Sequence, residues 1–255
     1  AKAKILAEQA AEVAETFLRK LITLEDLGLA LWDPTALAQI NQAAMAADDA
    51  FRAGDAQAAL ARYTELLARV TALDAGLPDR RAENLTQAQT ALSDNNSVDA
   101  LKFWAIAARL NPQKTDIQTT WQAVQKIPAI EALMSEADLA ERAGKIEAAE
   151  DILREATALF PNWTPARVAY ERMQQAVQQK QFQTSMTLGF AALAEESYES
   201  AISAFERAAR IDPTASAARD GLEQVRQAQL RQQIKGFFDE AQQAEAAGNW
   251  RNAQT

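Results

Sequence analysis

The sequence predicts an all-α fold, an α-solenoid of antiparallel helix pairs with long helices. Three observations favour this class. Alanine, glutamine, glutamate and leucine dominate the 255 residues, while only 8 glycines and 7 prolines are present to punctuate hairpins and strand loops. A short step from a turn residue to an alanine recurs along the chain. After three of these alanines the following segment ends at a proline, which indicates the end of a helix because proline cannot continue one.

The step from turn residue to alanine is five residues long and marks the reversal between two helices. Glycine and asparagine readily adopt the left-handed backbone conformation that ends one helix before a tight turn into the next. Glu196 is the exception to this choice of residue. The steps are Gly54 to Ala59, Asn95 to Ala100, Gly144 to Ala149, Glu196 to Ala201 and Gly248 to Ala253. We therefore expect a helix-helix turn at each of these places.

Each of the first four alanines begins a pattern that continues along the second helix of a pair. A large apolar residue follows after four residues and a further apolar residue after three more, which places all three on one helical face. Trp104 belongs to this pattern, and Trp121 to a second repeated core position, whereas Trp32 and Trp163 are less constrained and are candidates for exposure. The pattern's large residues are Tyr63, Trp104, Leu153 and Phe205, followed by Leu66, Ala107, Ala156 and Ala208.

The stretch around the fourth turn resembles a tetratricopeptide repeat. The residues that carry the resemblance are Leu188, Gly189, Tyr198, Ala201, Phe205, Ala208 and Pro213. Ser185 and Ala192 depart from the tryptophan and tyrosine that the family usually has there. The resemblance is strongest over residues 182–215, is degenerate elsewhere between residues 40 and 255, and implies a TPR-like α-solenoid. It also implies that Ala201 and Ala208 are buried against the helix that contains Gly189.

The spacing of the repeats is longer than the family period of about 34 residues. The last two intervals, Ala149 to Ala201 and Ala201 to Ala253, are each 52 residues. The excess equals about five helical turns, so a helix can lengthen without rotating its buried face. We expect long first helices near residues 165–195 and 216–247. The alternative is a three-helix repeat, broken near 178–181 and 232–233. Pro128 predicts a kink or break in the preceding copy.

Residues 1–33 form a separate N-terminal element. Apolar residues recur there at helical steps, which predicts an amphipathic helix ending near Gly28. Asp33 before Pro34 predicts that a new helix starts at that point. The first helix either caps the array or is a coiled-coil neck to an upstream anchor. Residues 34–255 form the repeat array, and we expect its last repeat to be truncated. The apolar residues of the first helix are Leu6, Ala10, Val13, Phe17, Leu21 and Leu24.

The composition excludes most catalytic chemistry. The chain has no histidine and no cysteine, which excludes Ser-His-Asp and Cys-His nucleophilic sites and thiolate zinc sites. It has no glycine-rich phosphate loop and no EF-hand loop. Carboxylate pairs such as Glu195 with Glu196 fit solvated helix faces. We therefore expect a protein that is not an enzyme, with no catalytic, cofactor-binding or metal-binding residues.

Charge and hydropathy argue against nucleic acid as a partner and against insertion into a membrane. The formal net charge is -9, with acidic and basic residues interspersed, which argues against nucleic acid as a partner. No stretch approaches the roughly 20 apolar residues that span a bilayer, so this segment is not expected to insert into a membrane. The first residue, Ala1, and the absence of cysteine favour a bacterial extracytoplasmic, periplasmic segment of a larger protein.

The best repeat also supplies the candidate binding site. In proteins that it resembles, the first helix of each pair lines a groove, and here that face carries Gln183, Met186, Phe190 and Leu193. Apolar residues on such a face suit a ligand helix or strand. The competing interpretation is that long helices or a neighbouring repeat bury them.

These observations lead to two functional hypotheses. The first is a non-catalytic scaffold that holds a protein or peptide partner on a helical-repeat surface. The second is a structural spacer or self-association module of a larger, possibly membrane-anchored protein.

Overall fold

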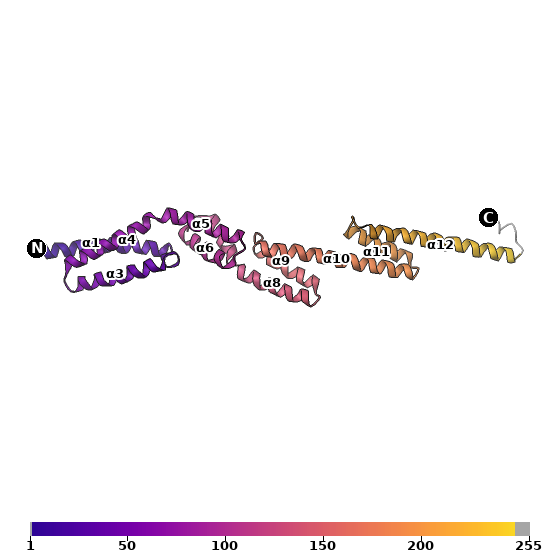
Figure 1. Cartoon of the computed structure of the whole chain (residues 1–255), viewed down its shortest axis with the longest axis horizontal. Coiled ribbons are helices and arrows are strands. Elements are labelled where there is room, and N and C mark those ends of the chain that lie inside the picture. Colours follow the sequence, from indigo (N-terminus) through magenta and orange to yellow (C-terminus); the bar gives the residue numbers. More distant parts are fainter. Residues whose placement is uncertain (1, 248–255) are drawn as a thin grey trace. The chain divides into compact units, whose positions relative to one another are not determined.

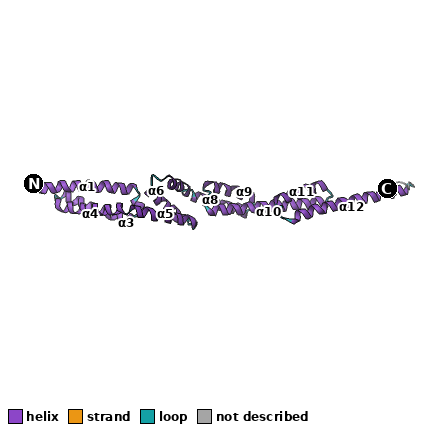
Figure 2. Ribbon diagram, turned by 90° about the horizontal axis from the view of Figure 1, so that it is seen from above, coloured by secondary structure: helices purple, strands orange, loops and turns teal. Residues whose placement is uncertain are grey.

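The computed structural model describes residues 2–247, and within this range every regular element is a helix (Figures 1 and 2). Neighbouring helices pack in pairs, and α1 also packs along α4, so the prediction of an all-α helical-repeat solenoid is confirmed. The helices are α1 Lys2–Asp26, α2 Leu29–Trp32, α3 Pro34–Arg52, α4 Ala56–Ala75, α5 Leu77–Ser93, α6 Ser97–Leu110, α7 Thr115–Val124, α8 Ile127–Arg142, α9 Ile146–Leu159, α10 Thr164–Ala194, α11 Tyr198–Ile211 and α12 Ser216–Ala246.

Four of the predicted turns lie in the described residues, and all four are present. Gly54 and Gly144 have φ values of 81° and 74°, and Asn95 and Glu196 have 57° and 58°. In each turn the N–H of the next residue donates to a carbonyl five positions earlier, as Ser197 does to Ala192 at 2.9 Å. Glu196 thus adopts the left-handed conformation without being glycine or asparagine. The fifth predicted turn, at Gly248, and its partner Ala253 lie outside the described residues.

The two long helices are continuous. α10 and α12 are each 31 residues long, and neither is interrupted where the three-helix alternative placed a break. The break expected near Pro128 does occur, because α7 ends at Val124 and α8 begins at Ile127. Pro128 then lies in the first turn of α8, where its missing N–H leaves no hydrogen bond unmade.

The N-terminal extensions of the long helices keep one buried register. Ile117, Ala166 and Ala218, which correspond in the repeat, are at most 2% exposed, and Val124, Met173 and Val225 are fully buried. The described contacts show two of these extensions packing against the preceding helix, which is the second helix of the previous pair. α7 packs against α6, and α12 packs against α11. The insertion of whole turns therefore preserved the packing face.

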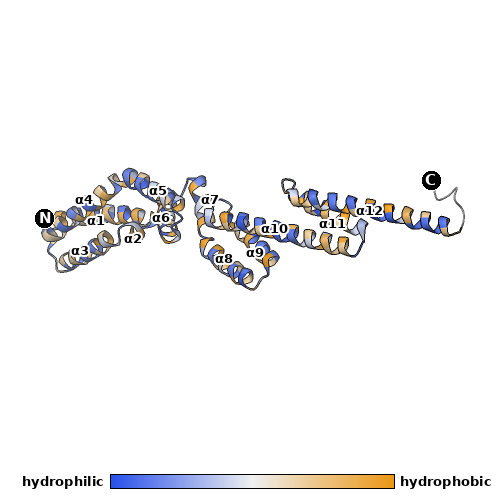
Figure 3. Ribbon diagram, turned by 45° about the vertical axis from the view of Figure 1, so that its right-hand side comes forward, coloured by the Kyte–Doolittle hydropathy of each residue, from blue (hydrophilic) through white to orange (hydrophobic). Residues whose placement is uncertain are grey.

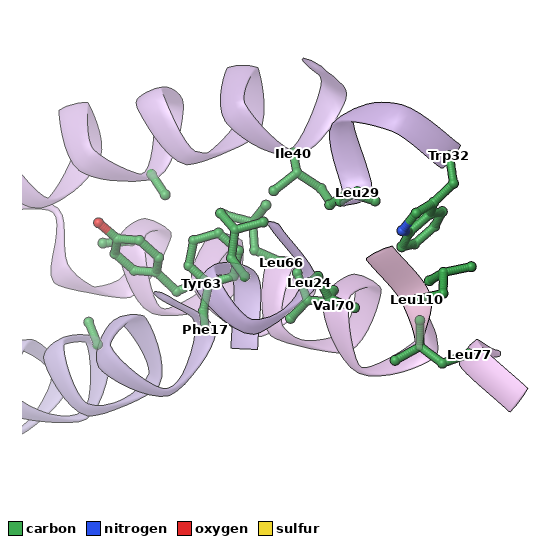
Figure 4. Close-up of a cluster of buried hydrophobic side chains, with 14 of the residues drawn as sticks. Phe17, Leu24, Leu29, Trp32, Ile40, Tyr63, Leu66, Val70, Leu77 and Leu110 are labelled. Atoms are coloured by element: carbon green, nitrogen blue, oxygen red, sulfur yellow. The ribbon is translucent and has the colours of Figure 1, made fainter. Parts of the chain in front are cut away.

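The first hydrophobic core lies between α1, α3 and α4 (Figure 4). α1 packs along α4, and its Phe17 and Leu24 are each 1% exposed. α1 ends at Asp26, two residues before the predicted position, and the short α2 follows. The predicted start of α3 is confirmed, because the Asp33 carboxylate accepts a hydrogen bond of 3.0 Å from the Ala36 N–H.

Two tryptophans proposed as exposed are instead buried. Trp163 is 2% exposed and packs in the core that contains Trp104. It lies in the turn between α9 and α10, where its backbone N–H donates to the Phe160 carbonyl. Trp32 is 9% exposed, and the Arg80 guanidinium lies 4.4 Å above its ring centroid. Both residues close a reversal of the chain, which the repeat pattern alone does not reveal.

The contacts divide the chain into two compact units. One comprises residues 1–136 with 152–168, and the other comprises residues 137–151 with 169–255. Within the second unit, α10, α11 and α12 each carry hydrophobic residues among polar ones (Figure 3). The candidate site lies in this unit, on the hairpin of α10 and α11.

Candidate protein-binding surface

The hairpin of α10 and α11 is built around Phe205, which is fully buried. Its ring lies against Gly189 of α10 and Gly221 of α12. A Cβ atom added to either glycine would lie 2.6 Å from Phe205 Cε1. Only glycine therefore allows the ring to reach both helix backbones.

The small residues of α11 flank this ring. Ala201 and Ala208 are both 0% exposed and lie in the same hydrophobic cluster as Phe205 and Met186 of α10. The expectation that both alanines are buried is confirmed. This packing fixes which face of α10 is turned toward α11.

The four predicted site residues do not form one exposed strip. Gln183 is exposed and Phe190 is 44% exposed, but Met186 is only 9% exposed and Leu193 is partly buried. Met186 and Leu193 both pack in the cluster around Phe205. For Met186 the competing interpretation, burial by neighbouring helices, describes the structure, because α11 covers more of α10 than the face assigned from the repeat pattern.

Phe190 joins the core to the surface. Its ring meets Phe205 edge to face, with the centroids 5.0 Å apart and the planes at 76°. The rest of the ring faces solvent. Phe190 lies two helical turns after Gln183, and this spacing places both side chains on the same face of α10.

Next to Gln183 the surface is hollowed and lined by amide side chains. The hollow has a volume of about 550 Å³. It is lined by Gln175, Gln178, Gln179, Phe182, Gln183, Ile211 and Asp212. The sequence analysis missed this feature, although the glutamine-rich run 174–183 was its visible signal.

A second hollow of about 610 Å³ lies between α10 and α11 on a different set of residues. Its lining is more strongly charged, with Glu195, Glu199 and Arg207 around Leu188. It includes none of the predicted site residues. Leu188 is 50% exposed, which makes it a useful comparison for Phe190.

Ion pairs hold the N-terminal part of α10 in place within the second unit. The Arg172 guanidinium donates two hydrogen bonds of 2.7 Å to the Glu141 carboxylate and so lowers the pKa of Glu141. The Lys180 ammonium donates a hydrogen bond of 2.9 Å to Glu147. Because these ion pairs are exposed, they orient α10 more than they contribute to the free energy of unfolding.

The described residues contain no cluster of three or more acidic side chains that could hold a metal ion. Within residues 2–247, no helix is both long enough and apolar enough to cross a membrane.

Comparison with known proteins gives one match. The family model of the tetratricopeptide repeat matches residues 183–214. No curated protein and no solved structure matches the chain. The matched segment spans α10 from Gln183 to its end, the turn at Glu196 and all of α11, the two helices of the hairpin around Phe205. Repeats of this family generally mediate protein-protein interactions, and folds of this type are typically non-catalytic. Residues 183–214 of this chain are a tetratricopeptide repeat.

Proposed function

We propose that this chain is a non-catalytic scaffold that holds a protein or peptide partner on the surface of its helical repeats. The observation that carries the proposal is the exposure of Phe190 on the same face of α10 as Gln183. A half-exposed aromatic ring that is anchored from below loses little conformational freedom when a partner covers it.

The chemistry of this face suits a peptide. Gln175, Gln179 and Gln183 follow one another at steps of four residues and are all exposed, so their amides form a row along α10. We call these three residues with Phe190 the glutamine strip. Each amide both donates and accepts hydrogen bonds, as a peptide backbone does. The amides would bind the main chain of the partner, and Phe190 would bind an apolar side chain.

Met186 and Leu193 have a supporting role in this proposal. They lie in the cluster beneath the strip and hold α10 against α11. Of the four predicted residues, only Gln183 and Phe190 then belong to the surface that meets the partner.

The test uses two exposed apolar residues of α10 as a matched pair. A library of displayed peptides is selected on the immobilised chain, and the selected peptides are measured against Phe190→Ala and Leu188→Ala. We expect Phe190→Ala to weaken binding about tenfold or more, as truncation of an aromatic anchor does. Leu188→Ala, similarly exposed but outside the strip, should leave binding unchanged.

The stability of Phe190→Ala separates binding from folding. Because Phe190 is 44% exposed and meets one core ring edge to face, its truncation should destabilise by about 1 kcal/mol. A loss of ~3–5 kcal/mol, as for a fully buried phenylalanine, would place Phe190 in the core. Peptides that bind Phe190→Ala and Gln183→Ala as well as the native chain would refute the strip.

We further infer that residues 1–33 cap the array rather than form a coiled-coil neck. The apolar face of α1 is occupied by packing on α4, and Phe17 and Leu24 are buried there. A coiled coil would need that same face. A dimer whose dissociation requires residues 1–31 to be removed would favour the spacer hypothesis instead.

A further inference from the structure

The C-terminal half of α12 carries an apolar face that is open to solvent. Leu230, Ile234, Phe237 and Phe238 are 56%, 47%, 69% and 66% exposed. Their spacing places Leu230, Ile234 and Phe237 on one side of the helix, with Phe238 at its edge. In the N-terminal half of the same helix the apolar Val225 is fully buried. Exposed apolar clusters of this kind mark interaction sites.

The same pattern occurs 104 residues earlier, on α8. Of six corresponding positions, four hold the same residue type, and each helix is followed by a glycine at the same distance, Gly144 or Gly248. The six positions of α8 are Ile130, Leu133, Met134, Ala137, Ala140 and Glu141, and those of α12 are Ile234, Phe237, Phe238, Ala241, Ala244 and Glu245.

On α8 this face is covered by a helix. Ile130 is fully buried, in one cluster with Ala156 of α9 and Phe160, which directly follows α9. The chain reverses at Gly144, where the Lys145 N–H donates to the Ala140 carbonyl at 2.9 Å, and so α9 returns along α8. α9 turns an alanine, a leucine and an alanine inward: Ala149, Leu153 and Ala156 are each at most 2% exposed.

We propose that Leu230, Ile234, Phe237, Phe238 and Ala241 of α12 form a receptor for an amphipathic helix of the α9 type. The helix carries alanine, leucine and alanine at relative positions 0, 4 and 7. This receptor is a different surface from the glutamine strip and does not depend on it. Its occupant is defined by the residues that cover the equivalent face of α8.

The residue at position 241 selects leucine over phenylalanine in the bound helix. Ala241 corresponds to Gly189 of α10, which lies 52 residues earlier. Phe205 fits against Gly189 only because a Cβ there, 2.6 Å from the ring, is absent. Ala241 has that Cβ, as does Ala137 in the copy whose second helix carries Leu153. A helix of the α11 type, with phenylalanine at the central position, therefore fits this face poorly.

A peptide titration tests the proposal on the whole chain. The peptide has the sequence of residues 145–160, and the chain carries one dye at Gln233→Cys, which is selective because the native sequence has no cysteine. We expect saturable binding, at least about tenfold weaker when Phe237 and Phe238 are both replaced by alanine. Val98→Ala changes a residue that is 74% exposed outside this face and should bind the peptide as the native chain does.

The preference for leucine over phenylalanine opposite Ala241 gives a second, sharper test. A Leu153→Phe peptide should bind the native chain at least about fivefold more weakly than the unaltered peptide, because the ring overpacks Ala241. In the Ala241→Gly chain this difference should disappear or reverse. Circular dichroism of the free peptides confirms that their helix contents match.

Three results would overturn the proposal: no binding, binding that the double alanine variant does not weaken, or an equal Leu153→Phe penalty in the Ala241→Gly chain. A concentration-dependent dimer that the same double variant abolishes would identify a second copy as the occupant, and the proposal would also fail. None of these outcomes bears on Phe190, so the glutamine strip is tested independently.

Discussion

The absence of one Cβ atom, at Gly189, allows the close packing of the tetratricopeptide hairpin. Gly189 and Gly236 are both helical glycines, but their surroundings differ. A Cβ at Gly189 would lie within 2.8 Å of three ring atoms of the fully buried Phe205, whereas a Cβ at Gly236 would meet nothing within 4 Å. The same substitution at the two positions should therefore have opposite signs.

We predict that Gly189→Ala destabilises the chain by roughly 1–3 kcal/mol, because overpacking exceeds the gain in helix propensity. Gly236→Ala should leave stability unchanged or raise it by up to about 1 kcal/mol. Thermal and urea unfolding of both variants, followed by circular dichroism, measure the difference. Fifty-two residues before Gly189, Phe205 and Gly221, the chain has Ala137, Leu153 and Ala169. Phe205→Leu should accordingly recover part of the stability lost in Gly189→Ala; a loss that simply adds would contradict this packing.

Tyr63 gives the chain a sensitivity to alkaline pH. Burial raises the pKa of its phenol to about 12, and the hydrogen bond that the hydroxyl donates to Asp48 adds to the shift. Because the folded-state pKa exceeds the ordinary value of about 10, the folded state holds this proton more tightly. The contribution to stability is complete below about pH 10 and is lost as the pH rises toward about 12.

We predict that the free energy of unfolding falls between about pH 10 and pH 12, and that this fall is smaller in Tyr63→Phe. Urea unfolding at a series of pH values tests it, and ultraviolet spectroscopy follows the tyrosinate directly. An identical pH dependence in Tyr63→Phe would show that other groups cause the loss.

At the scale of the helices, the sequence predicted the turns and breaks well because local chemistry controls them. Glycine, asparagine and proline restrict the backbone wherever they stand, so Gly54, Asn95 and Pro128 could be read without knowing their neighbours. Counting whole turns favoured a continuous α10 and α12, and the structure excluded the breaks near residues 178–181 and 232–233 that the sequence left open. These features required no knowledge of tertiary contacts.

The candidate site was harder to predict because burial depends on which helices meet. Met186 and Phe190 are four residues apart on one helix, yet α11 covers the first and leaves half of the second open. Trp163 is buried by its place in a turn, and the amide-lined hollow at Gln183 depends on the end of α11. A repeat pattern gives the helical face but not the width of the contact.

The turn at Glu196 offers a test at the level of one hairpin. Glu196 has a φ of 58°, a conformation that disfavours residues other than glycine by about 1–2 kcal/mol. Glycine would remove that strain but would lose more conformational entropy on folding, by about 0.5–1 kcal/mol. We predict that Glu196→Gly stabilises the chain by up to about 1 kcal/mol.

Gly144→Ala is the inverse experiment. Gly144 has a φ of 74° and nothing within 4 Å of an added Cβ, so any loss comes from the backbone alone. It should destabilise by about 1 kcal/mol. Thermal unfolding of the two variants measures both signs. Destabilisation by Glu196→Gly would mean that the glutamate side chain supports the turn more than its backbone strain opposes it.

At the scale of the whole chain, we expect each group of neighbouring helices to have its own local stability, rather than all helices depending on one common core. The described contacts join helices that are neighbours in the repeat, such as α3 with α4, α5 with α6 and α11 with α12. The buried residues form separate clusters, one around Phe17 and Leu66 and another around Phe205. In such an array each repeat depends mainly on the repeats next to it.

We predict that core truncations act locally. Leu66→Ala removes a side chain that is 1% exposed in the first cluster and should destabilise by about 2–5 kcal/mol. Hydrogen exchange measured by mass spectrometry should then show faster exchange in α1, α3 and α4 and unchanged exchange in α11. Phe205→Ala should do the reverse, with faster exchange in α11 and the first half of α12. The open second half of α12 should exchange fastest in the native chain, because a helix without tertiary contacts is only marginally stable. Equal acceleration of all helices by either variant would show instead that the chain unfolds as one cooperative unit.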